Sequence, residues 1–344
     1  MNKTQLQETA RALVASGKGI LAADESTGTI TSRFKTISVE STEASRRDYR
    51  EMLFRTKDLG KYVSGVILYD ETLRQKAADG TLLRDVLTSN KIMPGIKVDT
   101  GAKKLAGSPK ETVTEGLDGL AERMAEYAGL GARFAKWRAV IKIEGGDLPT
   151  QYCIETNAHA LARYARICQE AGVVPIVEPE VLIDGNHDID RCDAVTAATL
   201  HTVFHELHLQ GICLEGMLLK PSMVVSGKDC PKQAGIDDVA GRTVACLRRT
   251  VPAAVPGIVF LSGGQSDEVA TAHLNVMNAK FGPNPWKLSF SYGRALQDLA
   301  LKRWKGAPAN VAAAQQALHF RSKFNALAAE GRYSAEMERE LKAA

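Results

Sequence analysis

VVPIVEPEV, at residues 173–181, places apolar residues at successive positions and carries two glutamates near its end. Strands that are covered on both faces have such continuous apolar runs, as in parallel sheets flanked by helices. Seven further runs of this kind occur along the chain: GILAAD (19–24), YVSGVILYD (62–70), MPGIKVD (93–99), RFAKWRAVI (133–141), ICLEGMLLKP (212–221), IVFLSGG (258–264) and KLSFSYG (287–293). The sequence therefore predicts eight buried parallel strands.

Amphipathic helices are predicted between these runs, as in the stripe Leu200, Val203, Phe204 and Leu207. Alternating strands and helices fit either a (β/α)8 barrel or a doubly wound open sheet. A dinucleotide-binding open sheet would have G-x-G-x-x-G after its first strand, and GILAADESTG lacks it. We expect one domain over residues 1–344, an α/β (β/α)8 TIM barrel with its core at about 17–305. An N-terminal helix and a short C-terminal helical extension, about 306–344, would complete it.

Composition and charge argue against several classes of partner. The 44 basic and 40 acidic side chains leave a net charge of +4, too small and dispersed to predict a nucleic-acid partner. No stretch approaches the roughly 18 apolar residues of a membrane span, and residues 1–20 lack the apolar core of a secretion signal. The six cysteines form no C-x-x-C pair. We expect a cytoplasmic protein with no membrane contact.

Polar side chains stand where the predicted strands end. They are Asp24, Lys97, Lys136, Glu178, Glu180 and Lys220, followed by Ser262-Gly263-Gly264 and Ser291-Tyr292-Gly293-Arg294. The carboxyl ends of the strands form the active-site face of a barrel. A structural ion pair would explain any one of these charges, because a charge in an apolar strand is costly unless it is paired. The set as a whole indicates a functional site.

Three of these residues are lysines, which suggests amine chemistry. Lys220 follows Met217-Leu218-Leu219 and precedes Pro221, the most apolar setting of the three. Burial and neighbouring cations, here Lys97 and Lys136, lower the pKa of a lysine and favour attack of its neutral amine on a carbonyl to form a Schiff base. A simpler role remains open for Lys97, which is to bind phosphate.

Two carboxylates stand two residues apart in the run at 173–181, and a strand points such side chains the same way. The pKa values of Glu178 and Glu180 can therefore differ, so that one residue acts as a general acid/base and the other stays ionised. Strands seven and eight of a barrel commonly end at a phosphate. The glycines of Ser262-Gly263-Gly264 and Gly293 would let backbone N–H groups approach that anion, and Arg294 would add a bidentate charge.

At these residues the chain resembles the class I, Schiff-base-forming fructose-1,6-bisphosphate aldolases. Segments that carry the resemblance include KGILAADESTGTI, GVILYDETL, GIKVDTG, FAKWRAVIKI, LEGMLLKPSMV and SFSYGRALQ, and the order KWR, VEPE, LLKP, LSGGQS is very specific. The resemblance implies a lyase of glycolysis and gluconeogenesis that reversibly cleaves fructose 1,6-bisphosphate to dihydroxyacetone phosphate and glyceraldehyde 3-phosphate. It also implies no metal or other cofactor, sugar phosphates as the small-molecule partners, and a homotetramer.

The resemblance implies a role for each matching residue. Lys220 resembles the Schiff-base lysine, Glu178 the general acid/base with Glu180 as its partner, Asp24 the acid for C–C cleavage, and Lys136 the lysine that assists it. The ketose-side phosphate would be bound by Ser262, Gly263, Gly293 and Arg294, with Gly264 and Ser291 beside them. The distal phosphate would be bound by Ser26, Thr29, Arg33 and Lys97. Arg46 and Arg138 match positions near the substrate.

Two alternatives stay open from the sequence. A metal-dependent aldolase or hydrolase could use His201, His205 and His208, which share one helix face, although we expect that face to be solvated on the outer ring of a barrel. The second alternative is a barrel that has no enzymatic activity and serves only as a binding scaffold. The C-terminus departs from the family, since the chain ends in Ala344 without the terminal tyrosine of many members. We expect a short helical tail that brings no phenol to the barrel.

Overall fold

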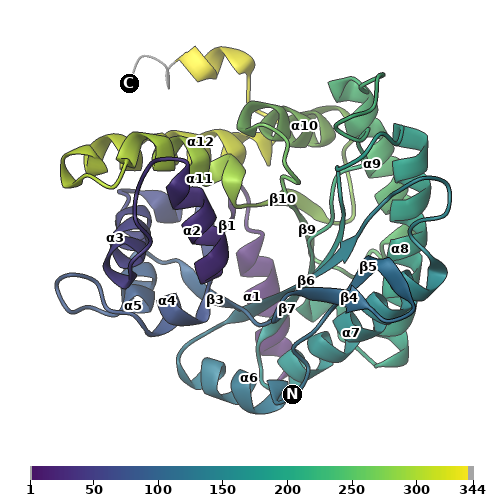
Figure 1. The fold of residues 1–344 in the computed structure, drawn as a ribbon, viewed down its shortest axis with the longest axis horizontal. Helices are drawn as coiled ribbons and strands as arrows, with labels where there is room; N and C mark the ends of the chain where they lie inside the picture. Colours follow the sequence, from purple (N-terminus) through teal and green to yellow (C-terminus); the bar gives the residue numbers. More distant parts are fainter. Residues whose placement is uncertain (1, 340–344) are drawn as a thin grey trace.

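The computed structural model describes residues 2–339, which form a closed barrel of eight parallel strands surrounded by helices (Figure 1). Around the barrel the strands follow the order β1-β2-β3-β6-β7-β8-β9-β10, with β10 pairing back to β1. Their bounds are β1 (Gly19–Ala23), β2 (Val63–Leu68), β3 (Met93–Lys97), β6 (Phe134–Ile141), β7 (Val174–Val181), β8 (Leu218–Leu219), β9 (Gly257–Phe260) and β10 (Lys287–Tyr292). The predicted TIM barrel is confirmed.

Helices surround the barrel (Figure 1). They are α1 (Lys3–Leu13), α2 (Thr27–Lys35), α3 (Glu43–Phe54), α4 (Asp70–Arg74), α5 (Leu83–Ser89), α6 (Leu120–Gly129), α7 (Gln151–Glu170), α8 (Ile189–Leu209), α9 (Ile236–Thr250), α10 (Asp267–Lys280), α11 (Arg294–Trp304) and α12 (Val311–Ala328). Several begin at a side-chain cap. Thr150 accepts a hydrogen bond from the Cys153 N–H at the start of α7, and Ser266 accepts one from the Val269 N–H at the start of α10.

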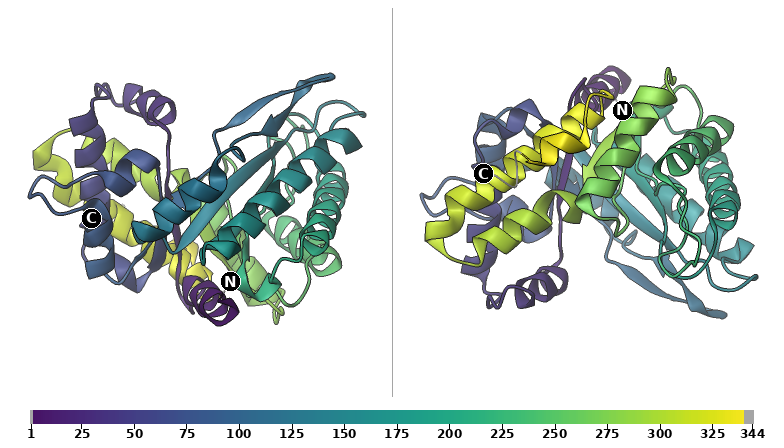
Figure 2. Two further views of the ribbon diagram at one scale, coloured as in Figure 1. Left: turned by 90° about the horizontal axis from the view of Figure 1, so that it is seen from below. Right: turned by 90° about the horizontal axis from the view of Figure 1, so that it is seen from above.

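Helix α1 closes the amino end of the barrel. Its residues Leu6 and Leu13 are buried in one apolar cluster with Phe134 of β6. The Phe134 ring fills the barrel interior because glycines face it: a Cβ on Gly95 would lie 2.3 Å from that ring. Figure 2 shows α1 and α2 on opposite sides of the barrel. The carboxyl ends of the strands are therefore the end at which a pocket can form.

Two local features differ from the expectation. An antiparallel hairpin, β4 (Ala102–Leu105) and β5 (Ser108–Thr114), follows β3. Its sequence is polar, so it gave no apolar run. The run at 212–221 contributes only Leu218 and Leu219 as a strand, because a 3₁₀ turn at Leu214–Gly216 precedes them and Pro221, which has no N–H, follows.

The C-terminal segment packs against the helices rather than entering the barrel. Tyr333 is buried, and its hydroxyl donates to Oε1 of Glu338 at 2.8 Å. The predicted helical extension at about 306–344 contains α12, and after Tyr333 the described chain forms a 3₁₀ turn at Ala335–Met337 and two further helical residues. The chain end at 340–344 lies outside the described residues. Within residues 2–339, each helix is too short or too polar to cross a membrane.

Candidate active site

A pocket of about 660 Å³ opens at the carboxyl ends of the strands. Fifteen of the residues predicted from the sequence line it: Asp24, Ser26, Thr29, Arg33, Lys97, Lys136, Arg138, Glu178, Glu180, Lys220, Ser262, Gly263, Ser291, Gly293 and Arg294. A larger cavity of about 930 Å³ lies at the amino end of the barrel, beside Lys18 and Trp286, and contains none of them. The predicted residues, which are far apart in the sequence, thus meet in one place.

Two buried lysines and two carboxylates form the floor of this pocket. Nζ of Lys136 lies 2.8 Å from Oδ2 of Asp24 and 3.1 Å from Oε2 of Glu178. Nζ of Lys220 lies 3.1 Å from Oε1 of the same Glu178. Lys136, Lys220 and Glu178 are each less than 5% exposed (4%, 4% and 3%). Glu178 therefore bridges the two ammonium groups, with one oxygen on each.

Strand geometry turns these side chains inward. Lys136 and Arg138 of β6 lie on either side of Trp137, whose ring stacks on Tyr164 of helix α7 outside the barrel. Because successive side chains of a strand alternate between faces, the two cations face the interior. On the neighbouring strand β7, Glu178 pairs in register with Arg138.

The charges of this cluster shift one another's pKa values. Burial alone would raise the pKa of Glu178, but the cations of Lys136 and Lys220 outweigh it and hold that pKa below its ordinary value. The pKa of Asp24 is lowered in the same way, against its burial, by Lys136 and Lys220. Burial would lower the pKa of Lys136, but the charges of Asp24 and Glu178 raise it. The two lysines thus favour the ionised form of Glu178. The sequence pattern suggested that one of the paired glutamates acts as a general acid/base and that the other stays ionised.

A second set of charges flanks the lysine cluster. Nε of Arg138 contacts Oε2 of Glu180, and the backbone N–H of Arg138 donates to Oδ2 of Asp99 at 3.3 Å. Nζ of Lys97 lies 3.7 Å from Oδ1 of Asp99. Sequence reasoning missed Asp99 as a pocket residue, although it ends the run MPGIKVD. In the structure, Asp99 is the carboxylate that pairs with Lys97.

The loops after β9 and β10 meet at one side of the pocket. Gly263 and Gly264 have positive φ values of +57° and +92°, which favour glycine. Gly264 does not line the pocket, but a Cβ on it would lie 3.4 Å from Nη2 of Arg294, so the absence of a side chain leaves room for the arginine. The Oγ atom of Ser291 is buried and has no hydrogen-bond partner among the described residues. The loops therefore offer a cation, an unsatisfied hydroxyl and accessible backbone to an anion.

Another part of the pocket is formed by the start of helix α2. Ser26 caps this helix, its Oγ accepting from the Thr29 N–H at 3.4 Å, and the two hydroxyls lie 3.1 Å apart. Nη1 of Arg33 lies 2.6 Å from Oε1 of Glu25. Glu25 is buried and lines the pocket, and its Oε2 atom has no hydrogen-bond partner among residues 2–339. Sequence reasoning missed Glu25 because its neighbour Asp24 ends the apolar run.

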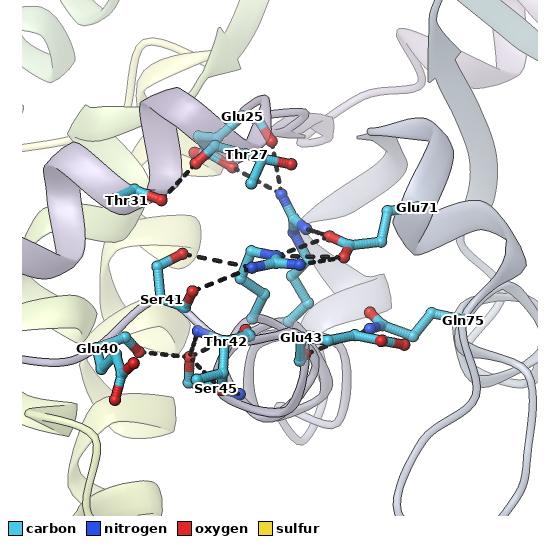
Figure 3. A network of polar contacts seen from close by, with 12 residues as sticks. Glu25, Thr27, Thr31, Glu40, Ser41, Thr42, Glu43, Ser45, Glu71 and Gln75 are labelled. Carbon is cyan, nitrogen blue, oxygen red and sulfur yellow. Dashed lines mark hydrogen bonds and ion pairs between the residues drawn. The ribbon is translucent and has the colours of Figure 1, made fainter.

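Arg46 is the one predicted residue that the structure places in a different network, around Glu71. Figure 3 shows Glu71 and Glu25 in this region. Its guanidinium binds both carboxylate oxygens of Glu71, with Nη2 2.5 Å from Oε1 and Nε 2.9 Å from Oε2. Arg50, which is 1% exposed, lies 3.5 Å from the same carboxylate and donates to the backbone oxygen of Glu25 at 2.7 Å. Arg46 thus reaches the pocket only through Glu71, Arg50 and Glu25.

The three histidines of helix α8 do not join the pocket. His201, His205 and His208 are exposed on the outer face of that helix, as expected from the apolar stripe on its other side. Among residues 2–339, no group of three or more histidine, cysteine, aspartate or glutamate side chains is arranged to hold a metal ion.

A family model described as fructose-bisphosphate aldolase class-I matches residues 5–344. The chain belongs to this family. A probable fructose-bisphosphate aldolase class 1 from Xanthomonas axonopodis pv. citri is 58% identical over 334 residues, covering 97% of this chain and 99% of the relative. Fructose-bisphosphate aldolase 1 of Toxoplasma gondii is 55% identical over 330 residues, covering 96% and 91%.

A solved structure agrees with this assignment. Fructose-bisphosphate aldolase from Plasmodium falciparum, in complex with TRAP and a small-molecule inhibitor, matches with a TM-score of 0.96 and 51% identity over 97% of this chain and 96% of that one. The resemblance drawn from KWR, VEPE, LLKP and LSGGQS is confirmed, and the chain is an aldehyde-lyase of the Schiff-base class.

Proposed function

We propose that this pocket cleaves fructose 1,6-bisphosphate reversibly to dihydroxyacetone phosphate and glyceraldehyde 3-phosphate, with Lys220 as the Schiff-base lysine. One observation carries the proposal. The amine of Lys220 is buried at the floor of the pocket, 3.1 Å from a carboxylate that also contacts a second lysine. A buried lysine beside a proton acceptor is the arrangement that amine catalysis requires.

The first step produces a neutral amine on Lys220. Its Nζ lies 3.1 Å from Oε1 of Glu178, so the proton passes to that carboxylate. The amine attacks C2 of the ketose, and Glu178 returns the proton to the developing alkoxide, giving a carbinolamine. Glu178 then takes a proton from nitrogen and gives it to the hydroxyl, which leaves as water. The product is a protonated imine, and Glu178 ends the step ionised, as its lowered pKa favours.

The imine draws electrons from the C3–C4 bond. Asp24 takes the proton of the C4 hydroxyl, the C3–C4 electron pair moves toward the imine nitrogen, and C4 leaves as the aldehyde of glyceraldehyde 3-phosphate. Lys136, 2.8 Å from Asp24, stabilises the negative charge that develops on the C4 oxygen as its proton leaves. Protonation of the enamine at C3 and hydrolysis of the imine release dihydroxyacetone phosphate and restore Lys220. The steps use side chains of the pocket and water.

The two ends of the pocket suit the two phosphates. Ser262, Gly263, Ser291, Gly293 and Arg294 would bind the ketose-side phosphate, with Gly264 leaving room for Arg294. Ser26, Thr29, Arg33 and Lys97 would bind the distal phosphate, and Arg33 would then exchange Glu25 for the substrate. Arg138 and Glu180 also line the pocket and would contact the sugar hydroxyls. Arg46 would support the distal end through Glu71 and Arg50, rather than touch substrate.

We further propose that residues 1–344 act as one unit, in the cytoplasm, as a homotetramer that serves glycolysis and gluconeogenesis without a metal cofactor. Membership of the class-I family supports this reading. Analytical ultracentrifugation of the purified chain tests the tetramer directly, since a monomer of 37.2 kDa and its tetramer differ fourfold in mass.

A coupled cleavage assay on Lys220→Met tests the proposed function. We expect the turnover number to fall about a thousandfold or more, because the covalent route is removed. Lys61→Met is the matched control, since Lys61 is 65% exposed and does not line the pocket, and it should leave turnover unchanged. A Lys220→Met enzyme within tenfold of the parent would overturn the assignment.

A further inference from the structure

A buried ion pair anchors the C-terminal segment to helix α12, at the edge of the fold where α12 and α10 meet (Figure 1). Nη1 of Arg321 donates to Oε1 and Oε2 of Glu338 at 2.8 and 2.7 Å, and the Tyr333 hydroxyl donates to Oε1 at 2.8 Å. Arg321 is 1% exposed and Glu338 is 4% exposed. Removing either partner would leave a buried, uncompensated charge.

The same arginine reaches the first turns of helix α10. Its Nη2 donates to Oγ1 of Thr271 at 3.0 Å, and its Nε lies 3.9 Å from Oδ2 of Asp267. The Thr271 hydroxyl in turn donates to the backbone oxygen of Asp267 at 2.7 Å. Glu338 therefore fixes the arginine that holds the amino end of α10.

The amino end of α10 touches both loops of the ketose-phosphate site. Nε2 of Gln265 donates to the backbone oxygen of Ser262 at 3.1 Å, and Oε1 of Gln265 lies 2.6 Å from Nδ1 of His273 on α10. On the other side, the Tyr292 hydroxyl donates to the backbone oxygen of Ala270 at 3.0 Å. Tyr292 directly precedes Gly293 and Arg294. Residues 267–273 of α10 are thus the shared support of the two loops.

We propose that Glu338 is a positioning residue for the ketose-phosphate site. It acts through Arg321 and α10 on Ser262 at one loop and on Arg294 at the other. The inference rests on the proposed function, which makes these two loops the phosphate site. Hydrogen bonds to an anion weaken steeply when donors move by a few tenths of an ångström, so a loosened α10 would cost affinity for phosphate more than it would cost the lysine chemistry.

The experiment compares Glu338→Gln, Tyr333→Phe and the control Glu336→Gln, which changes an exposed glutamate of the same segment. For each variant, KM and kcat for fructose 1,6-bisphosphate and the inhibition constant of inorganic phosphate are measured. We expect Glu338→Gln to raise KM and the phosphate constant about tenfold, the equivalent of one charge-assisted hydrogen bond, with kcat within about twofold. Tyr333→Phe should raise KM and the phosphate constant by a smaller factor, and Glu336→Gln should change neither constant.

A purely structural cluster would behave differently. If Glu338→Gln and Tyr333→Phe lowered the melting temperature but left KM and the phosphate constant unchanged, the positioning role would be overturned. A fall in kcat with unchanged KM would overturn it as well. If Glu338→Gln does not fold, the milder Tyr333→Phe decides between these outcomes.

Arg294→Ala separates this inference from the proposed function. If Arg294→Ala raises the phosphate constant and Glu338→Gln does not, the positioning role fails and the phosphate site stands. If Arg294→Ala leaves the phosphate constant unchanged, the assigned phosphate site itself is wrong, and the inference falls with it.

Discussion

Nζ of Lys220 lies 3.1 Å from Oε1 of Glu178, and the other oxygen of that carboxylate lies 3.1 Å from Nζ of Lys136. One carboxylate thus serves two buried ammonium groups. Transfer of a single proton from Lys220 to Glu178 frees an amine and leaves Lys136 as the remaining cation of the cluster. The geometry therefore links the nucleophile, its proton acceptor and the cation that stabilises charge during cleavage.

Replacing Lys136 by methionine should change the pH dependence as well as the rate. Lys136 favours the ionised forms of Asp24 and Glu178, so its removal should raise both pKa values. The acid limb of the kcat/KM profile should then move to higher pH, and kcat should fall about a hundredfold or more. Steady-state kinetics between pH 4.5 and 8 measure both, with Lys61→Met as the control. An unmoved acid limb would show that Lys136 does not set these pKa values.

Arg294→Ala should weaken binding of phosphorylated ketoses far more than binding of non-phosphorylated analogues. The phosphate would lose a charge-assisted pair, worth a few kcal/mol or about a hundredfold in KM. Kinetics with fructose 1,6-bisphosphate and with a sugar that lacks the ketose-side phosphate give the comparison. Lys302→Ala, an exposed change on the same helix α11, is the control. Equal effects on both substrates would count against a phosphate role for Arg294.

The buried His273 should make the fold less stable in mild acid. Burial lowers its pKa from 6.5 to about 4. Between these pH values the unfolded chain binds a proton that the folded chain does not, so the free energy of unfolding should fall as pH drops from 6.5 toward 4. Urea unfolding at several pH values measures the slope, and His273→Gln should flatten it by up to about 3 kcal/mol over that range. His205→Gln, an exposed change, should keep the parent's dependence of unfolding free energy on pH. An equally steep dependence in His273→Gln would show that His273 is not the source of the pH effect.

Excess EDTA should leave cleavage activity unchanged. The proposed mechanism uses Lys220 as the electron sink, where a metal-dependent aldolase uses the metal ion. Activity is measured after prolonged dialysis against the chelator, and again after addition of zinc. Activity that disappears with EDTA and returns with zinc would favour the metal-dependent alternative.

The strand pattern predicted the barrel because burial on both faces demands continuous apolar runs, and the polar ends of those runs predicted most of the pocket. Lys136 and Glu178 could be placed together from the sequence since parallel strands end at the same face. Helix periodicity also separated His205 from the pocket.

Other parts of the site depend on contacts that no local pattern records. The β4–β5 hairpin has a polar sequence, so it resembled a loop. The burial of Arg50 follows from pairing with Glu71 and the backbone of Glu25, which come from separate elements. The tail was expected to be helical and to bring no phenol to the barrel, and its sequence did not predict the buried pair of Glu338 with Arg321. The sequence around Glu338 does not indicate that this charge is buried, because its partner Arg321 lies on a different helix.

Borohydride trapping tests the central claim most directly. The purified chain is incubated with dihydroxyacetone phosphate, the imine is reduced, and the modified peptide is mapped by mass spectrometry. The account predicts a single adduct on Lys220, in the segment LEGMLLKPSMV, with Lys97 and Lys136 unmodified. An adduct on Lys97 or Lys136, or no adduct in an enzyme that still cleaves its substrate, would contradict it.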